Sequence, residues 1–165
     1  MDGGMKSSRR RNREVKNYDK LLFVCKTNTA VSPMAEAIAA RLLLLEDILI
    51  DSKGLVVLFP EPINPKAEAI LVSHSLTLKD HISQPFGPDD FDPRTLILTM
   101  NREQKEKIAE EYNSTENLYT LSEYIGTDEE IPDPYGGGMA DYGHCFEQLE
   151  GMLEKAADKL RREEN

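Results

Sequence analysis

The stretch FVCKTNTAVSPMAEAIA, residues 23–39, decides the fold. It passes from an apolar run that ends at Cys25, through a short polar loop, into Ser32-Pro33 and a series of helix-forming residues. Serine is a preferred N-cap residue and proline is favoured at the first helical position. The sequence therefore predicts a buried strand over 21–25 and a helix that begins directly after Ser32.

The rest of the chain repeats this alternation of strand and helix. Further strands are predicted over 48–50, 95–100 and 117–121, and further helices over 65–73, 101–112 and 142–161. Because strands alternate with helices, we expect an α/β, three-layer Rossmann-like fold with a four-stranded parallel sheet and helices on both faces.

Length and composition indicate one domain of ordinary size. The 165 residues contain no run of 18 apolar residues and no apolar segment behind the polar start, so we expect no membrane partner and a cytoplasmic protein. Two cysteines are too few for a disulfide framework, and no spacing of His and Cys suggests a zinc site. The expected cofactors are none, and the expected metal sites are none.

Charge is distributed unevenly along the chain. Residues 1–20 carry seven Lys or Arg against three Asp or Glu, which leaves 13 against 27, a net −14, in residues 21–165. We expect 1–20 to be a basic, disordered leader and 21–165 a single domain whose acidic field excludes nucleic acid. The alternative is that the arginines of 9–13 form a nucleic-acid, membrane-surface or nuclear-targeting patch.

The loop after the first strand is the predicted ligand site, because ligands of such folds bind at the carboxyl ends of the strands. Backbone N–H groups and the positive end of a helix dipole together bind anions and stabilise a thiolate. Cys25, at the start of this loop, is therefore a candidate nucleophile. The alternative is a buried cysteine with only a packing role.

Two motifs carry a resemblance to a known family. VCKTNTAVSPMAEA resembles the signature loop of the low molecular weight protein tyrosine phosphatases, which reads Val-Cys, two residues ending in Gly, Asn, two residues, then Arg-Ser-Pro and commonly Met-Ala-Glu. PDPYGGG, residues 132–138, resembles the family's Asp-Pro-Tyr loop. The resemblance extends from Leu21 to about Leu160.

The resemblance implies a metal-independent phosphatase site. Cys25 would attack phosphorus, Asp133 would be the general acid and base, and Tyr135 would form a wall of the pocket. The remaining implied positions are phosphate-loop residues (Lys26, Thr27, Asn28, Thr29, Ala30 and Ser32) and residues that support the loop (Ser52 and His81). The alternatives are that Asp133 and Tyr135 begin an ordinary turn and that His81 is a loop histidine.

The departures from the family motif bear on activity. Val31 stands where the family has an arginine whose planar fork binds two phosphoryl oxygens. By analogy with other phosphoryl-transfer arginines, its loss should cost roughly 1,000- to 100,000-fold in rate, about 4 to 7 kcal/mol. Thr27 replaces a glycine, which matters if the loop needs a positive φ there, and Ala30 replaces a frequent second cysteine.

The sequence is therefore compatible with three functions. The first is a pseudophosphatase that binds a phosphorylated protein or a small phosphoanion. The second is an active phosphomonoesterase in which Lys26 or Lys53 substitutes for the arginine, and in which Thr29 marks a preference for phosphoarginine over phosphotyrosine. The third is an arsenate-reductase-like redox enzyme, for which Cys145, in a helix predicted to face the core, is a poor resolving cysteine.

Overall fold

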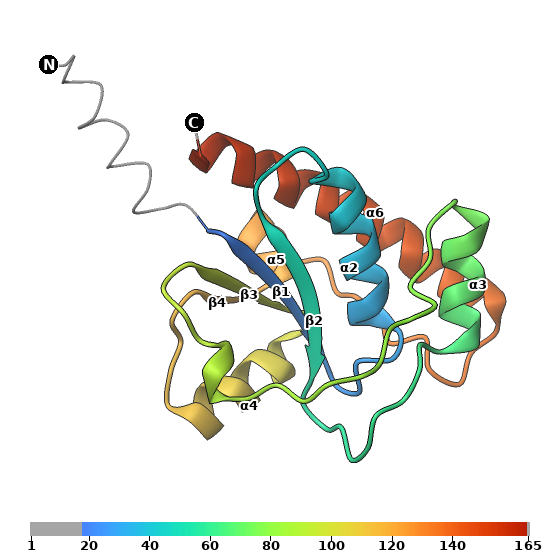
Figure 1. Cartoon of the computed structure of the whole chain (residues 1–165), viewed down its shortest axis with the longest axis horizontal. Helices are drawn as coiled ribbons and strands as arrows, with labels where there is room; N and C mark the ends of the chain where they lie inside the picture. The colour runs from blue at the N-terminus through green and yellow to red at the C-terminus, as the bar shows by residue number, and fades with distance from the viewer. Residues whose placement is uncertain (1–17, 165) are drawn as a thin grey trace, which may run out of the picture.

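A computed structural model describes residues 18–164 of the chain (Figure 1). Most of the predicted leader, residues 1–17, lies outside the described residues. The strands are β1 (Lys20–Cys25), β2 (Leu49–Gly54), β3 (Thr95–Thr99) and β4 (Leu118–Thr120). The helices are α2 (Val31–Leu42), α3 (Pro65–Ser73), α4 (Arg102–Tyr112), α5 (Leu121–Ile125) and α6 (Met139–Glu164), with a 3₁₀ turn at Pro88–Asp90.

The four strands form one parallel sheet in the order β2-β1-β3-β4, which confirms the predicted α/β fold. Cys25, the last residue of β1, is paired with Gly54, the last residue of β2. Val24 is paired with Thr99 at the end of β3. The carboxyl ends of three strands therefore meet at one edge of the sheet, and the loop after β1 begins there.

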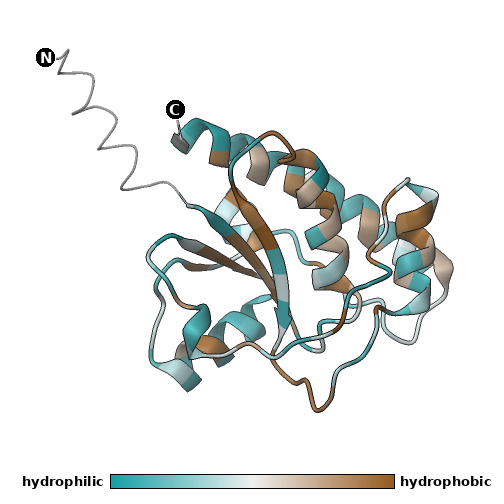
Figure 2. Ribbon diagram, in the orientation of Figure 1, coloured by the Kyte–Doolittle hydropathy of each residue, from teal (hydrophilic) through white to brown (hydrophobic). Residues whose placement is uncertain are grey.

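Helices cover both faces of the sheet. In Figure 1, α4 lies on one face, and α2 and α6 cross the other. The larger core joins Phe23 and Leu96 of the sheet to α2, α3, α5 and α6, and the smaller core joins Val24 and Ile97 to Ile108 of α4. Because successive strand residues point to opposite faces, adjacent residues such as Phe23 and Val24 enter different cores. Figure 2 shows hydrophobic residues along the strands and a mixture of hydrophobic and hydrophilic residues along the helices.

The first helix begins earlier than predicted. Its N-cap is Ala30 and its first helical residue is Val31, so the prediction that Ser32 caps the helix is wrong. The Ser32 hydroxyl lies 3.0 Å from the Cys25 sulfur and is 0% exposed, so it is engaged in the loop and not at the helix end. Pro33 is tolerated because the first backbone N–H groups of a helix have no intrahelical partner.

Other boundaries also differ. β2 continues to Gly54, because an edge strand accepts the polar residues that had suggested a turn. α5 was not predicted, although Thr120 and Glu123 form a capping box of recognisable spacing. α6 extends the predicted 142–161 at both ends. Among the described residues, no helix has the length and apolar character needed to cross a membrane.

Candidate active site

The loop between β1 and α2 curls around the Cys25 sulfur. Its one left-handed residue among those described is Asn28, with φ of 60°, so Thr27 does not take the positive φ considered for it. Asparagine tolerates this conformation better than most residues do. The turn directs the Asn28 N–H at the Cys25 sulfur over 3.3 Å and places the Asn28 side chain, 0% exposed, beneath the loop.

Asn28 is the centre of a buried hydrogen-bond network. Its Nδ2 donates to Ser32 Oγ at 3.0 Å and to Ser52 Oγ at 2.9 Å, while its Oδ1 accepts from the Gln84 N–H at 3.0 Å. His81 Nε2 lies 2.8 Å from the Asn28 carbonyl oxygen, which can only accept, so Nε2 carries the proton. The structure thus brings together Asn28, Ser32, Ser52 and His81, the residues expected to hold the loop.

The donor and the acceptor can be assigned in each hydrogen bond of this network. Ser52 Oγ donates to Glu36 Oε1 at 2.6 Å and accepts from Asn28. Ser32 Oγ also accepts from Asn28, so its own hydrogen is free to point at Cys25 Sγ, 3.0 Å away. The sulfur therefore has two donors within reach, the Ser32 hydroxyl and the Asn28 N–H.

Glu36 ends this network. Burial raises the pKa of its carboxyl group to about 7, the hydrogen bond from Ser52 opposes the rise, and the negative charge of Asp51 adds to it. The sequence motif contains Glu36, but only the fold shows that it contacts β2. Nothing in the local sequence signals that contact, because it joins residues from two separate elements.

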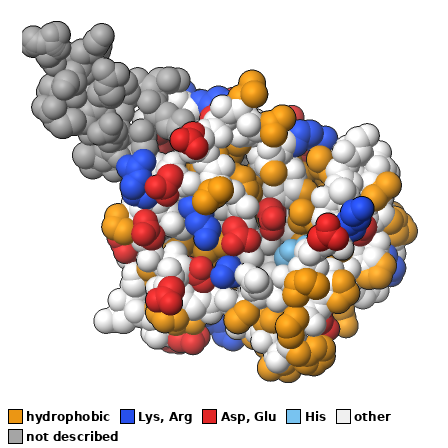
Figure 3. All heavy atoms as spheres, viewed as in Figure 1, with side chains coloured by type: hydrophobic (Ala, Val, Ile, Leu, Met, Phe, Trp, Pro, Cys, Tyr) orange, Lys and Arg blue, Asp and Glu red, His pale blue; other side chains and the backbone are white. Residues whose placement is uncertain are grey.

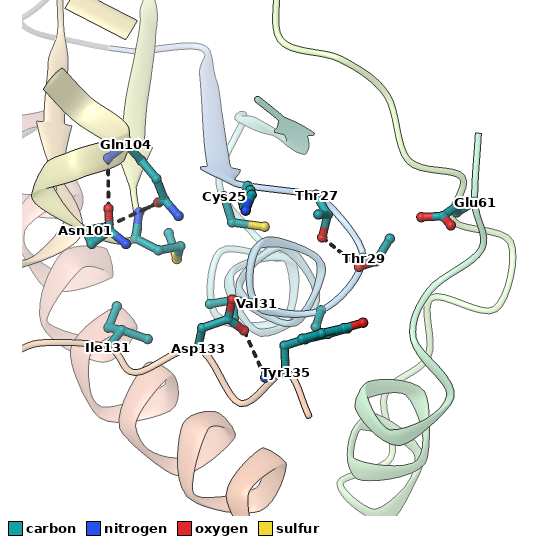
Figure 4. Close-up of a pocket in the computed structure, with 13 residues that line it drawn as sticks. Cys25, Thr27, Thr29, Val31, Glu61, Asn101, Gln104, Ile131, Asp133 and Tyr135 are labelled. Atoms are coloured by element: carbon teal, nitrogen blue, oxygen red, sulfur yellow. Dashed lines mark hydrogen bonds between the residues drawn. The ribbon is translucent and has the colours of Figure 1, made fainter. Parts of the chain in front are cut away.

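A cavity of about 430 Å³ opens above the loop. Figure 4 shows the Cys25 sulfur and the Asp133 carboxylate turned toward it, with the Tyr135 ring at its rim. Of the predicted site residues, those that line it are Cys25, Lys26, Thr27, Thr29, Ala30, Val31, Asp133 and Tyr135. Asn28 and Ser32 lie beneath it, as the network requires.

Five lining residues were not predicted, namely Glu61, Met100, Asn101, Gln104 and Ile131. The rule that ligands bind at the carboxyl ends of strands could have found Met100 and Asn101, which follow β3 directly. Glu61 and Ile131 lie in loops whose position the sequence does not signal.

Asp133 belongs both to the cavity and to a turn. Its Oδ1 accepts from the Tyr135 N–H at 3.0 Å, which is the local turn bond expected of an aspartate followed by proline. Tyr135 is 83% exposed. An ordinary turn and a place at the cavity are therefore compatible for Asp133, because the turn presents its carboxylate to the cavity.

Val31 contributes only hydrocarbon to the cavity wall and is 5% exposed. Lys53 does not supply a cation to the cavity: it follows Ser52 on the opposite face of β2, and its Nζ lies 3.5 Å from Asp90 Oδ1. Lys26 is exposed and lines the cavity. Among the described residues that line it, Lys26 is the sole basic side chain.

Cys145 packs in the core, as predicted, and is 3% exposed. Burial raises the pKa of its thiol to about 12, and the negative charges of Asp133 and Cys25 add to the rise. A thiol kept protonated is a poor resolving nucleophile. In the part of the chain that the structure describes, no group of three or more His, Cys, Asp or Glu is placed to hold a metal ion.

Comparison with known proteins agrees with this geometry. The low molecular weight protein-tyrosine-phosphatase PtpB of Staphylococcus haemolyticus is 34% identical over 136 residues, covering 82% of this chain and 96% of the relative. The PtpB of Staphylococcus aureus is 32% identical over 139 residues, covering 84% of this chain and 97% of the relative.

Solved structures give the same result. The YwlE arginine phosphatase from Geobacillus stearothermophilus matches with a TM-score of 0.81 and 29% identity, over 87% of this chain and 94% of that one. A low molecular weight protein tyrosine phosphatase from T. tengcongensis has a TM-score of 0.81 and 28% identity, over 86% of this chain and 99% of that one. Residues 20–165 match the family described as "Low molecular weight phosphotyrosine protein phosphatase", and the chain belongs to that family.

Proposed function

We propose that this protein binds a phosphorylated protein, or a small anion bearing a phosphoryl group, in the cavity above Cys25. Hydrolysis of the phosphoryl group is slow. Val31 is the observation that carries the proposal. The first turn of α2 supplies backbone N–H groups for anion binding, but a valine side chain offers no donor that could follow charge into the transition state.

The alternative is a working phosphatase in which Lys26 substitutes for the arginine. Its support is that Lys26 lines the cavity and that the Cys25 sulfur has two hydrogen-bond donors within reach. In this case Cys25 would be the nucleophile and Asp133 the general acid and base. A lysine supplies a point charge without the planar fork, so the impaired function remains the first proposal.

The class of phosphorylated residue also belongs to the proposal. The PtpB relatives are named tyrosine phosphatases and the YwlE structure is titled an arginine phosphatase. Thr29 lines the cavity at the position where threonine suggests phosphoarginine. We further propose a cytoplasmic location and no nucleic-acid partner for the acidic domain.

Turnover of p-nitrophenyl phosphate, phosphotyrosine and phosphoarginine tests the proposal. The wild type should be slow on all three, and Val31→Arg should raise turnover by about 1,000-fold or more, the lower end of the range for a phosphoryl-transfer arginine. Cys25→Ser should abolish the activity of the Val31→Arg variant.

Binding is measured separately, by titrating a phosphotyrosine and a phosphoarginine peptide into the wild type. Wild-type turnover at the rate of the PtpB relatives, abolished by Cys25→Ser, would establish the alternative. Absence of binding to either peptide would overturn the binding of phosphorylated protein, and absence of p-nitrophenyl phosphate turnover as well would overturn the alternative.

A further inference from the structure

The loop over residues 55–64 contributes Glu61 to the lining of the cavity, and both of its ends are hydrogen-bonded to the loop after β1. Near its start, the Val56 N–H donates to the Lys26 carbonyl at 2.8 Å. At its end, the Asn64 N–H donates to the Thr29 carbonyl at 2.8 Å. Figure 3 shows hydrophobic side chains gathered at the lower edge of the molecule, where Figure 1 places this loop.

Glu61 is the residue of this loop that lines the cavity. Its backbone is clamped to Ser83: the Glu61 N–H donates to Ser83 Oγ at 2.9 Å, and the Ser83 N–H donates to the Glu61 carbonyl at 2.8 Å. Figure 4 shows the Glu61 carboxylate turned toward Thr29, on a different side of the cavity from Asp133. The hydrogen bonds to Ser83 fix the Glu61 backbone, and the exposed side chain lies at the rim of the cavity.

This carboxylate affects which ligand charge is favoured in the cavity. Its lining contains two acidic side chains, Glu61 and Asp133, against Lys26, and Val31 contributes no charge. Phosphotyrosine would bring a phosphoryl dianion on a neutral ring into that field. Phosphoarginine carries a guanidinium group next to the phosphoryl group, and a guanidinium pairs well with a carboxylate.

We propose that Glu61 is a specificity-determining residue, which selects phosphoarginine over phosphotyrosine by pairing with the guanidinium group beside the phosphoryl group. The inference rests on the proposed function, since it requires that the cavity bind phosphorylated protein. It concerns which residue is bound and is independent of whether the bound group is hydrolysed.

The test compares two peptides of one sequence that differ only in carrying phosphoarginine or phosphotyrosine. Binding is measured by calorimetry on the full chain with Cys25→Ala, which consumes no ligand. Glu61→Gln should weaken phosphoarginine binding by roughly two- to five-fold, the range for an exposed ion pair, and should leave phosphotyrosine binding equal or tighter. Glu110→Gln, at an exposed position on α4, is the matched control and should change neither affinity.

Other outcomes separate this inference from the function beneath it. If Glu61→Gln changes both affinities equally, or changes neither, Glu61 does not select the ligand, although the cavity still binds phosphorylated protein. If the parent chain binds neither peptide, the role of Glu61 and the binding of phosphorylated protein are both wrong. Glu61→Lys should reverse the preference toward phosphotyrosine, and thermal unfolding of each variant confirms that the comparison is between folded proteins.

Discussion

Ser52 Oγ lies 2.9 Å from Asn28 Nδ2, and this buried hydrogen bond ties the loop after β1 to the end of β2. Both side chains are almost fully shielded from water, with Asn28 at 0% exposure and Ser52 at 2%. A buried polar group that loses its partner pays the desolvation cost of that group. The shape of the loop after β1 is therefore coupled to the stability of the sheet.

Replacing Asn28 with alanine should lower the free energy of unfolding by more than the cost of placing alanine in a left-handed backbone conformation. Asn113, exposed and with φ of 51°, is a matched control, because Asn113→Ala measures the cost of a left-handed alanine, about 1 to 2 kcal/mol. Asn28→Ala also leaves its buried partners unpaired, so its cost should exceed the control by about 2 kcal/mol or more. Urea unfolding of both variants measures the difference, and equal costs would show that the network contributes no stability.

Gly54 allows the loop to approach the sheet. A Cβ at this position would lie 2.9 Å from both the Asn28 Cβ and the Thr27 carbonyl carbon, closer than real Cβ contacts occur. Gly54→Ala should therefore cost about 1 to 3 kcal/mol. Gly151, in the middle of α6 with open space around it, is the control, and Gly151→Ala should stabilise by about 0.5 to 1 kcal/mol. A Gly54→Ala variant as stable as the wild type would show that loop and strand can separate without cost.

The sequence predicted the sheet and most of the residues that line the cavity because both depend on local patterns. Apolar runs mark β1 and β3, and the spacing from Cys25 to Ser32 marks the loop. The sequence misplaced the start of α2. Ser32 suits both the N-cap of a helix and a hydrogen-bonding position inside the loop, and only its partners in the structure distinguish the two. The sequence missed Glu61, whose place at the cavity depends on hydrogen bonds to a segment far along the chain.

The Ser32 hydroxyl should control the reactivity of Cys25. Removing it leaves the Asn28 N–H as the remaining donor within reach of the sulfur, so the sulfur that reacts has one hydrogen bond instead of two. Ser32→Ala should slow alkylation of Cys25 by iodoacetamide near neutral pH, measured in a Cys145→Ser background so that one cysteine reacts. Ser73→Ala, at an exposed serine of α3, is the control. Unchanged alkylation in Ser32→Ala would mean that this hydroxyl does not act on the sulfur.

Glu36 should make stability depend on pH in a defined window. Its pKa rises from an ordinary 4.5 to about 7 on folding, chiefly through burial, so between these values the folded protein holds a proton that the unfolded chain has released. The stability from this group is complete below pH 4.5 and is lost as the pH rises through 7.

Substituting Glu36 with glutamine removes that titration. The free energy of unfolding of Glu36→Gln, relative to the wild type, should therefore increase from pH 5 to pH 8, because only the wild type loses the proton. Urea unfolding at several pH values measures it, and Glu147→Gln, at an exposed position on α6, should keep a constant difference from the wild type. A constant difference for Glu36→Gln as well would mean that the carboxyl titrates alike in the folded and unfolded chains. The Ser52 hydroxyl would then face the same charge on Glu36 throughout this range, and the loop around Cys25 would be insensitive to pH at this end of its network.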